Sequence, residues 1–202
     1  MPTLISNQKK QQNISQLKKF YSILIQGIDI SKAKHGDIEN WDWNLDQTNF
    51  IETYLIENLK IAKNCKTKAG CWNSSGKIFA YSKKNTQFAS DITSYYKLEL
   101  ADGTYLAIFK ENTEHCHFYI DLNGARKPNR YGEDCYILTF TKSKFNDYIH
   151  DIPHSGLYFY GFGLPRTKLI NDPYGYGCNK NGIGELCGAL YQADGWQNIT
   201  GN

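Results

Sequence analysis

The sequence predicts one α+β domain, in which a long N-terminal helix and a second helix pack on an antiparallel β-sheet with disulfide-stapled loops. Residues 1–35 show helical hydrophobic periodicity, nearly all aromatic residues fall after position 40, and six cysteines are spread over the chain. With 202 residues the chain can bury a core of its own. We expect a helix at 1–35, a connecting segment and second helix at 36–70, and a β-rich head with a C-terminal disulfide loop at 71–202.

The N-terminal helix is predicted over residues 4–34, which contain no proline and a single glycine. Apolar residues recur there at steps of three and four, as on one face of a helix. Lys32 and Lys34 followed by Gly36 are typical of a helix end. Residues 8–13 are entirely polar, so packing on the head should begin after them. The predicted apolar face consists of Ile14, Leu17, Phe20, Tyr21, Leu24 and Ile28.

A second helix is predicted over residues 49–64, where apolar residues form one stripe and Asn49 with Glu52 resembles a capping pair. Trp41 and Trp43 precede it and are expected to cover the joint between the two helices, since large aromatic side chains dominate protein cores. The stripe consists of Phe50, Tyr54, Leu55, Leu59 and Ala62.

An antiparallel sheet is predicted because Asp102-Gly103 separates two alternating apolar segments, which is a strong hairpin signal. The region from residue 171 onward is rich in Gly, Asn and Asp and is expected to be a loop. The predicted strands cover residues 95–100, 105–110, 117–121, 135–141 and 156–162.

The six cysteines form no CxxC pair, which argues against a zinc ribbon and favours disulfides in an extracytoplasmic protein. Buried free thiols in a cytosolic protein are the alternative. The N-terminus has no apolar run long enough for a signal peptide or membrane span, so we expect an export or anchoring segment upstream of it. Short spacing predicts Cys65 with Cys71 and Cys178 with Cys187, which leaves Cys116 for Cys135.

Charge and motifs exclude several classes of function. The net charge is only +3, from 23 basic and 20 acidic residues without one basic cluster, so the charge pattern does not indicate a nucleic-acid partner. The sequence contains no nucleophile signature, phosphate-binding glycine loop or paired zinc-site histidine motif. We therefore expect a protein that is not an enzyme, although a hydrolase whose carboxylates meet only in the fold remains an alternative.

Residues 121–134 hold the densest polar pattern, Asp-x-Asn-Gly followed by Pro-Asn and Gly-x-Asp. This pattern resembles the start of a calcium loop, but Ala125 and Gly132 stand where an EF-hand needs oxygen ligands. We interpret the segment as a rigid turn whose two aspartates accept backbone hydrogen bonds, with calcium as the alternative and no other cofactor expected. The turn residues would be Asn123, Gly124, Pro128 and Gly132, the first two with positive φ; the calcium ligands would be Asp121, Asn123 and Asp134.

His115 and His117 lie on one face of a predicted strand. Two histidines at this spacing can chelate zinc or copper, but no carboxylate or thiol is predictably placed to complete the set. We interpret the pair as part of an exposed strand edge.

Three segments in this order, residues 2–28, 121–134 and 187–196, resemble the type IV pilin and type II secretion pseudopilin family. The first is similar to the stretch after the hydrophobic anchor of prepilin-type proteins, the second to a loop of pilin-like heads, and the third to the Cys and Gly-Trp near the end of such chains. The sequence departs from the family in lacking the cleavage motif, the anchor helix and an aromatic ending.

The resemblance implies a pilin-like fold and a structural subunit of a type IV pilus or type II secretion pseudopilus-like filament, with the apolar face of the N-terminal helix in filament packing. It implies further copies of the chain, related minor pilins and an inner-membrane assembly machinery as partners, and membrane attachment through a hydrophobic helix. The implied location is the bacterial inner membrane and periplasm before assembly and the cell surface after it. A secreted glycan- or protein-binding module or adhesin is the second function, and an extracytoplasmic hydrolase the third.

Overall fold

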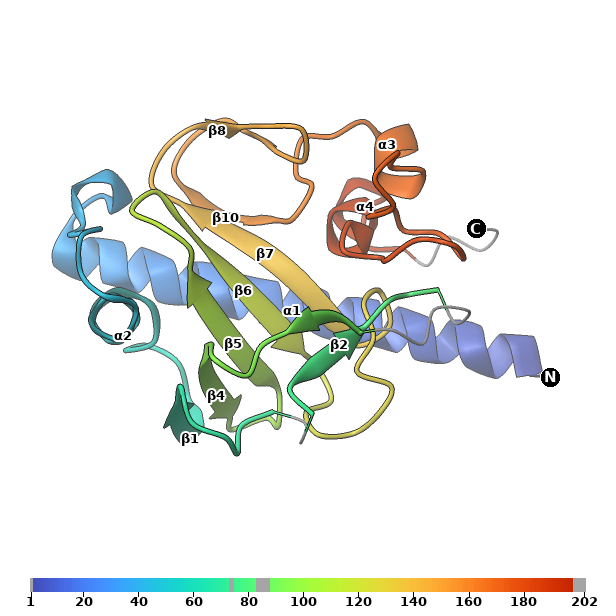
Figure 1. The fold of residues 1–202 in the computed structure, drawn as a ribbon, viewed down its shortest axis with the longest axis horizontal. Coiled ribbons are helices and arrows are strands. Elements are labelled where there is room, and N and C mark those ends of the chain that lie inside the picture. Colours follow the sequence, from blue (N-terminus) through green and yellow to red (C-terminus); the bar gives the residue numbers. More distant parts are fainter. Residues whose placement is uncertain (1, 73–74, 83–87, 198–202) are drawn as a thin grey trace.

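A computed structural model describes residues 2–72, 75–82 and 88–197. A long helix, α1 (Pro2–His35), lies across one face of a six-stranded antiparallel sheet, and its N-terminal turns run beyond the sheet (Figure 1). The strand order in this sheet is β1 (Ile61–Lys66), β4 (Tyr96–Leu100), β5 (Tyr105–Lys110), β6 (His115–Asp121), β7 (Cys135–Thr141) and β10 (Gly156–Phe159). Two small two-stranded sheets pair β2 (Lys77–Phe79) with β3 (Phe88–Asp91), and β8 (Phe145–Asn146) with β9 (Asp151–Ile152).

Helix α1 ends where the sequence predicts. Gly36 takes a φ of +82°, and its N–H donates to the carbonyl of Lys32 at 2.8 Å, which closes the last turn. Five members of the predicted apolar face are buried, and the sixth, Tyr21, is half-buried and donates to the carbonyl of Leu157 at 2.9 Å. This face therefore packs on the chain's own sheet. The five buried members are Ile14, Leu17, Phe20, Leu24 and Ile28.

The sheet is covered on both faces because successive side chains point to opposite sides. The face toward α1 belongs to the main core, with Leu98, Leu106, Ile108, Phe118, Ile120, Leu138 and Phe140. The face turned away from α1, called the second face below, carries a smaller core that includes Ala107, Tyr119, Cys135 and Ile137.

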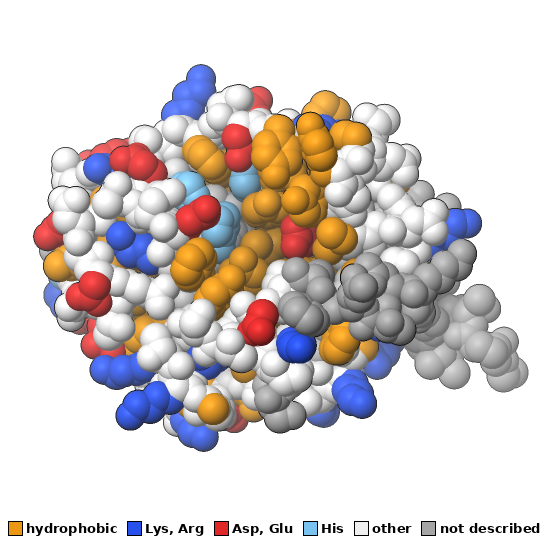
Figure 2. Space-filling view, viewed as in Figure 1, with side chains coloured by type: hydrophobic (Ala, Val, Ile, Leu, Met, Phe, Trp, Pro, Cys, Tyr) orange, Lys and Arg blue, Asp and Glu red, His pale blue; other side chains and the backbone are white. Residues whose placement is uncertain are grey.

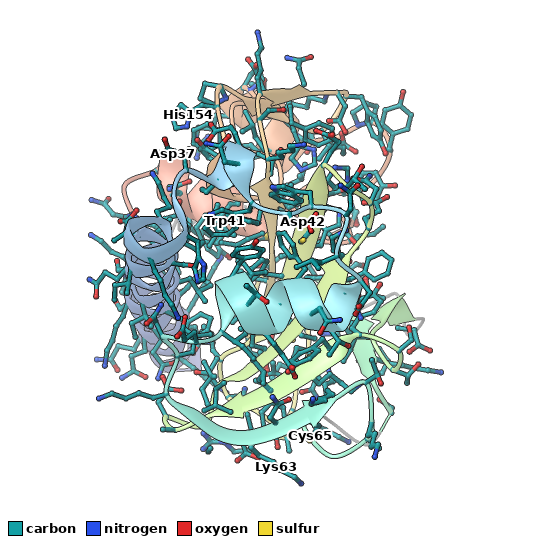
Figure 3. All side chains as sticks on the ribbon, turned by 90° about the vertical axis from the view of Figure 1, so that its left-hand side faces the viewer. Asp37, Trp41, Asp42, Lys63, Cys65 and His154 are labelled. Carbon is teal, nitrogen blue, oxygen red and sulfur yellow. A yellow bond between two sulfur atoms is a disulfide. The ribbon has the colours of Figure 1, made fainter. Side chains whose placement is uncertain are left out.

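Two tryptophans cover the joint after α1, as predicted. Trp41 follows a short 3₁₀ turn (Ile38–Asn40) and lies in the connection shown in Figure 3, where its ring stacks on Tyr54 with centroids 4.6 Å apart. The indole N–H of Trp41 donates to the Gly36 carbonyl and that of Trp43 to the Ile38 carbonyl, each at 2.9 Å. Both tryptophans are thus core residues with satisfied polar groups.

The predicted second helix at 49–64 is wrong. The helical segment consists of α2 (Gln47–Phe50) continued by one π-helical turn, η2 (Ile51–Leu55), and its cap is Asp46, whose carboxylate accepts the N–H groups of Thr48 and Asn49. Ile61–Lys66 instead forms the edge strand β1, which pairs with β4. The apolar pattern of these residues is compatible with either a helix or a strand. Pairing with the distant strand β4 makes residues 61–66 a strand.

The other predicted strands are present, but β10 ends at Phe159, three residues before the predicted 162. Strands β5 and β7 coincide with the predicted 105–110 and 135–141, whereas β6 begins two residues before the predicted 117. At the predicted hairpin, Gly103 takes a φ of +84° and the Asp102 carboxylate accepts the N–H of Thr104 at 3.0 Å. Local turn chemistry therefore sets the register of β4 against β5.

Two of the three predicted disulfides are formed, Cys65–Cys71 and Cys178–Cys187. The third is wrong, since Cys116 and Cys135 are free and buried. Cys116 pairs across the β6–β7 ladder with Phe140 and lies in the main core, whereas Cys135 pairs with Asp121 and lies in the core of the second face. The two thiols stand at opposite ends of the ladder and on opposite faces of the sheet, which no disulfide can span.

The C-terminal region is more ordered than the predicted loop. It contains α3 (Arg166–Ile170) and α4 (Cys187–Ala193), and α4 is buried along five consecutive residues from Cys187 to Tyr191. The predicted fold class is therefore corrected. The α+β class holds, with a six-stranded antiparallel sheet, one long helix and two disulfides, but the described residues contain neither the predicted second long helix nor a third disulfide.

Candidate functional site

The second face of the sheet carries the cluster with the clearest chemical potential. His115 and His117 alternate with Cys116 along β6, so both imidazoles point to this face while the thiol points to the main core. In Figure 2 histidine side chains lie beside a diagonal band of hydrophobic side chains on the same side of the molecule. The predicted exposed edge is corrected here, because His115 is only 9% exposed and β6 is an inner strand.

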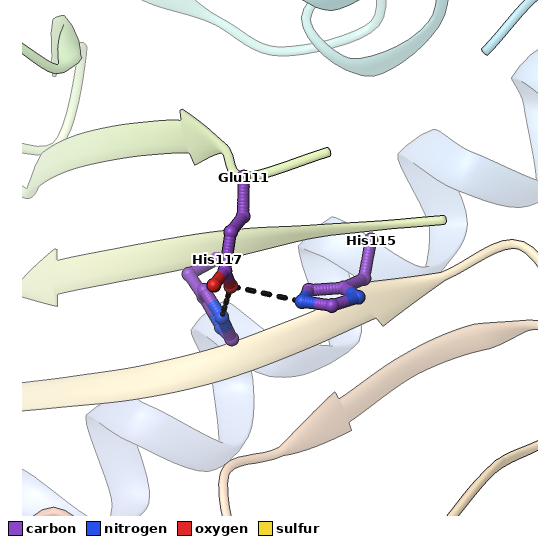
Figure 4. Close-up of side chains that lie close together, drawn as sticks. All are labelled: Glu111, His115 and His117. Atoms are coloured by element: carbon purple, nitrogen blue, oxygen red, sulfur yellow. Dashed lines mark hydrogen bonds and ion pairs between the residues drawn. The ribbon is translucent and has the colours of Figure 1, made fainter. Parts of the chain in front are cut away.

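Glu111 completes a three-residue group with the two histidines. It follows β5 directly, and the tight turn to β6 brings its carboxylate over the imidazoles (Figure 4). In this turn the Asn112 side chain accepts the N–H groups of Glu114 at 2.7 Å and His115 at 3.1 Å. One carboxylate oxygen, Glu111 Oε2, lies 2.8 Å from Nε2 of His115 and 2.8 Å from Nε2 of His117. The group is therefore set by the local geometry of one hairpin.

The electrostatics of the group follow from these contacts. The pKa of Glu111 is lowered to about 2, chiefly by its hydrogen bond to His117 and further by that to His115, against the opposing effect of burial. The Glu111 side chain is 48% exposed, whereas those of His115 and His117 are 11% and 12% exposed. A carboxylate open to solvent thus faces two nearly buried imidazoles.

A second layer of side chains holds the histidines in place. Thr139 Oγ1 on β7 lies 3.3 Å from Nδ1 of His117 and 2.9 Å from Nε2 of His150. Nδ1 of His150 lies 3.1 Å from Asp147 Oδ1. Burial lowers the pKa of His150 to about 4, so this imidazole is neutral at physiological pH. The ring of Phe145 stacks on His115 with centroids 4.8 Å apart.

Such a group can bind a metal ion. The three ligand atoms of Glu111, His115 and His117 lie within 4.8 Å of one another, and no other such cluster of His, Cys, Asp or Glu occurs in the described part of the chain. Sequence reasoning found the histidine pair and missed Glu111. The short turn between β5 and β6 could have indicated it. Only four residues separate the two strands, so Glu111, the first of them, must lie beside β6.

The predicted loop at 121–134 is a hydrogen-bonded turn. Both carboxylate oxygens of Asp134 accept hydrogen bonds, from the N–H of Arg130 at 2.7 Å, the N–H of Asn129 at 3.0 Å and the side-chain amide of Asn123 at 2.7 Å. Gly124 takes positive φ as predicted, but the second such residue is Asn129 in place of Asn123. Pro128 follows a cis peptide bond, and Gly132 also has positive φ.

Asp121 lies beneath this turn and is fully buried. Burial raises the pKa of its carboxyl group to about 8, and the neighbouring Asp134 contributes to the shift. The N–H of Asn123 donates to Asp121 Oδ1 at 3.2 Å, while the side-chain oxygen of Asn123 is buried without a partner. The interactions therefore match the predicted rigid turn, and a calcium ion on Asp121, Asn123 and Asp134 stays a prediction.

The fold and the cluster together define a disulfide-bonded α+β protein with a surface group of metal-binding type. Residues 3–200 match a family of unknown function, DUF6613, and the chain belongs to that family. No curated protein and no solved structure matches the chain. No helix in the described residues is long and apolar enough to cross a membrane.

Proposed function

We propose that this protein is a structural subunit of an extracytoplasmic filament of the type IV pilus or type II secretion pseudopilus kind. The observation that carries the proposal is α1, a helix of 34 residues that packs on the head along one strip only. At 1.5 Å per residue it is about 50 Å long, which exceeds what the core of a small domain requires. The helix is therefore suited to act as a stem.

The exposed strip of α1 is where a neighbouring subunit would pack. The predicted filament face is occupied by the chain's own sheet, so contacts between subunits must use the opposite side of the helix. That side is polar for most of its length and includes Ser15, Lys19, Ser22 and Gln26. It ends at Ile30, an exposed apolar residue with 55% of its surface accessible. Further copies of the chain and related minor subunits are the partners that this strip would contact.

The two disulfides support an extracytoplasmic location, because disulfides form and persist in oxidising compartments. They also suit a surface filament, since each closes a loop that would otherwise be open to proteolysis. No enzymatic role is part of this proposal.

A second function, a secreted binding module, is favoured by one observation. Tyr148 and Tyr174 are 51% and 66% exposed and pack edge to face with ring centroids 5.2 Å apart. Exposed aromatic pairs are common in binding surfaces for glycans and proteins. This pair lies on loops of the head, whereas Ile30 lies on the stem, so the two functions can be separated by mutation.

The test compares Ile30→Asp with Tyr174→Asp in the organism that makes the protein. Each change replaces an exposed apolar side chain by a charge, so thermal melting of the purified proteins should leave both midpoints close to wild type. We expect Ile30→Asp to abolish incorporation into filaments sheared from the cells, measured by immunogold electron microscopy, and Tyr174→Asp to assemble normally. Normal assembly of Ile30→Asp with loss of ligand binding in Tyr174→Asp would favour the binding module instead.

A further inference from the structure

We propose that Glu111, His115 and His117 bind one divalent transition-metal ion, with Zn²⁺ as the preferred ion. The ligands would be one carboxylate oxygen of Glu111 and Nε2 of each imidazole, the three atoms that converge in Figure 4. The inference concerns the second face of the sheet and does not depend on filament assembly.

The distances from Glu111 to the two histidines are close to those of a metal site. Around tetrahedral zinc, with bonds near 2.0–2.1 Å, neighbouring ligand atoms lie about 3.3 Å apart. The two nitrogen–oxygen distances to Glu111 Oε2 are now 2.8 Å, so the carboxylate must withdraw by about half an ångström. Glu111 is half-exposed and free to move outward, while the histidines stand on an inner strand. The two imidazoles are thus held by a rigid backbone with their Nε2 atoms within 4.8 Å of each other.

The hydrogen-bond chain behind His117 directs a lone pair at the proposed site. His150 is neutral and places its one N–H toward Asp147, so its Nε2 accepts the hydroxyl hydrogen of Thr139. The Thr139 oxygen then accepts the N–H on Nδ1 of His117. In neutral His117 this leaves Nε2 with a lone pair that faces Glu111 Oε2 at 2.8 Å.

The hydrogen bond to Glu111 uses a proton on this nitrogen, and a metal ion that binds both atoms takes the place of that proton. A metal ion satisfies both atoms at once, and the chain of donors from His117 through Thr139 and His150 to the acceptor Asp147 is the second-shell arrangement that orients metal-bound histidines. His115 has no partner on Nδ1, so its ring is held by Phe145. His117 is therefore the anchored ligand of the group.

The donor set selects the class of ion. Imidazole nitrogen with one carboxylate suits zinc and copper, whereas calcium and magnesium prefer oxygen ligands only. Three protein ligands leave a fourth position, and the exposure of Glu111 opens that position toward solvent. A water molecule or a donor atom from another molecule could fill it.

The experiment is isothermal titration of the full chain with ZnCl₂ after removal of metals by a chelator. We expect one Zn²⁺ per chain, and an affinity at least roughly 10-fold weaker in Glu111→Gln and in His117→Gln. His154→Gln is the control, because His154 is an exposed histidine that contacts Tyr158 and Ser155 outside the group, and it should bind zinc like wild type. Melting in the presence of chelator verifies that each variant is folded.

A positioning role for Thr139 is tested in the same titration. Thr139→Val removes the hydroxyl behind His117 and should weaken zinc binding roughly 10-fold. Thr141→Val is matched to it, since Thr141 lies on the same strand and face but bonds Ser143, and it should leave the affinity unchanged. Absence of zinc binding in wild type, or equal binding in wild type, Glu111→Gln and His117→Gln, would overturn the proposal.

Discussion

Glu185 couples the stability of the protein to pH. Its side chain is half-buried beside Tyr119, Tyr131 and Tyr160, whose pKa values are raised chiefly by their own burial and to a smaller extent by the charge of Glu185. Burial raises the pKa of Glu185 itself from 4.5 to about 7. Between these values the folded chain holds this proton and the unfolded chain has released it. The stability contributed by Glu185 is therefore lost as the pH rises through this window.

We predict that Glu185→Gln removes this dependence, because glutamine has a similar shape and no charge to bury. The free energy of unfolding at about pH 8 should rise by roughly 2 kcal/mol relative to wild type, with little change at about pH 5. Urea unfolding at the two pH values measures the effect. Glu57→Gln is the control, since Glu57 is an exposed partner of Lys34, and it should keep the wild-type loss of stability. If Glu185→Gln keeps that loss as well, another group causes it.

Helix α4 packs so closely on the sheet that one of its positions accepts only glycine. A Cβ atom on Gly188 would overlap the aromatic ring of Phe159 on β10, and both residues are buried in the main core. Gly27 in α1 is the matched case, because an added Cβ there would lie 3.7 Å from Leu59, an ordinary contact distance.

Gly188→Ala is expected to destabilise the protein by about 1–3 kcal/mol, since inserted atoms in a packed core force neighbours to shift. Gly27→Ala should instead stabilise it by roughly 0.5–1 kcal/mol through helix propensity. Chemical unfolding of the two variants beside wild type gives both values. A neutral Gly188→Ala would mean that α4 can move away from Phe159 without cost.

The loop from 121 to 134 depends on Asp134, whose oxygens accept three hydrogen bonds. We predict that Asp134→Asn lowers the free energy of unfolding by about 1–3 kcal/mol. The new side-chain NH₂ group would face a backbone N–H, and two donors cannot form a hydrogen bond. Asp102→Asn is the control, since Asp102 accepts a single bond in an exposed turn. Thermal melting of each variant is the measurement.

Calcium tests the alternative interpretation of the same loop. A turn held by its own hydrogen bonds should give equal melting midpoints in calcium and in a calcium-selective chelator. A cation bound only by the folded state must raise the midpoint. A shift that Asp121→Asn abolishes would establish the calcium site.

The covalent frame of the molecule consists of two local disulfides and two buried thiols. Cys65–Cys71 closes a loop beside the edge strand β1, and Cys178–Cys187 ties the start of α4 to the preceding loop. Burial raises the pKa of the Cys116 thiol to about 12. It raises the pKa of the Cys135 thiol well above its usual value as well. Both thiols are thereby kept unreactive in the folded state.

A thiol count tests this frame. The folded protein without reductant should react with no equivalent of a thiol reagent, and unfolding in denaturant should expose the two thiols of Cys116 and Cys135. Absence of any thiol after unfolding would show that these cysteines are paired after all. Mapping the disulfides by mass spectrometry distinguishes the pairings directly.

Several features could be predicted from the sequence because their signals lie close together along the chain. The periodicity of α1 and its end at Gly36, the hairpin at Asp102 and Gly103, and the two disulfides over short spacings all depend on residues a few positions apart. Local propensity and turn chemistry act over such separations, so the pattern of residue types was sufficient.

The remaining features depend on which distant segments meet. Residues 61–66 form a strand because β4 offers an edge to pair with, although their pattern suits a helix equally well. Cys116 and Cys135 stay unpaired because the β6–β7 register separates them. Glu111 reaches the histidines through the β5–β6 hairpin, and Thr139 supports them from β7. The amino-acid sequence alone therefore determined the long helix, the central strands and the histidine pair. Only the tertiary structure decided the strand partners and the three-residue group, because register across a sheet is set by contacts between segments far apart in the chain.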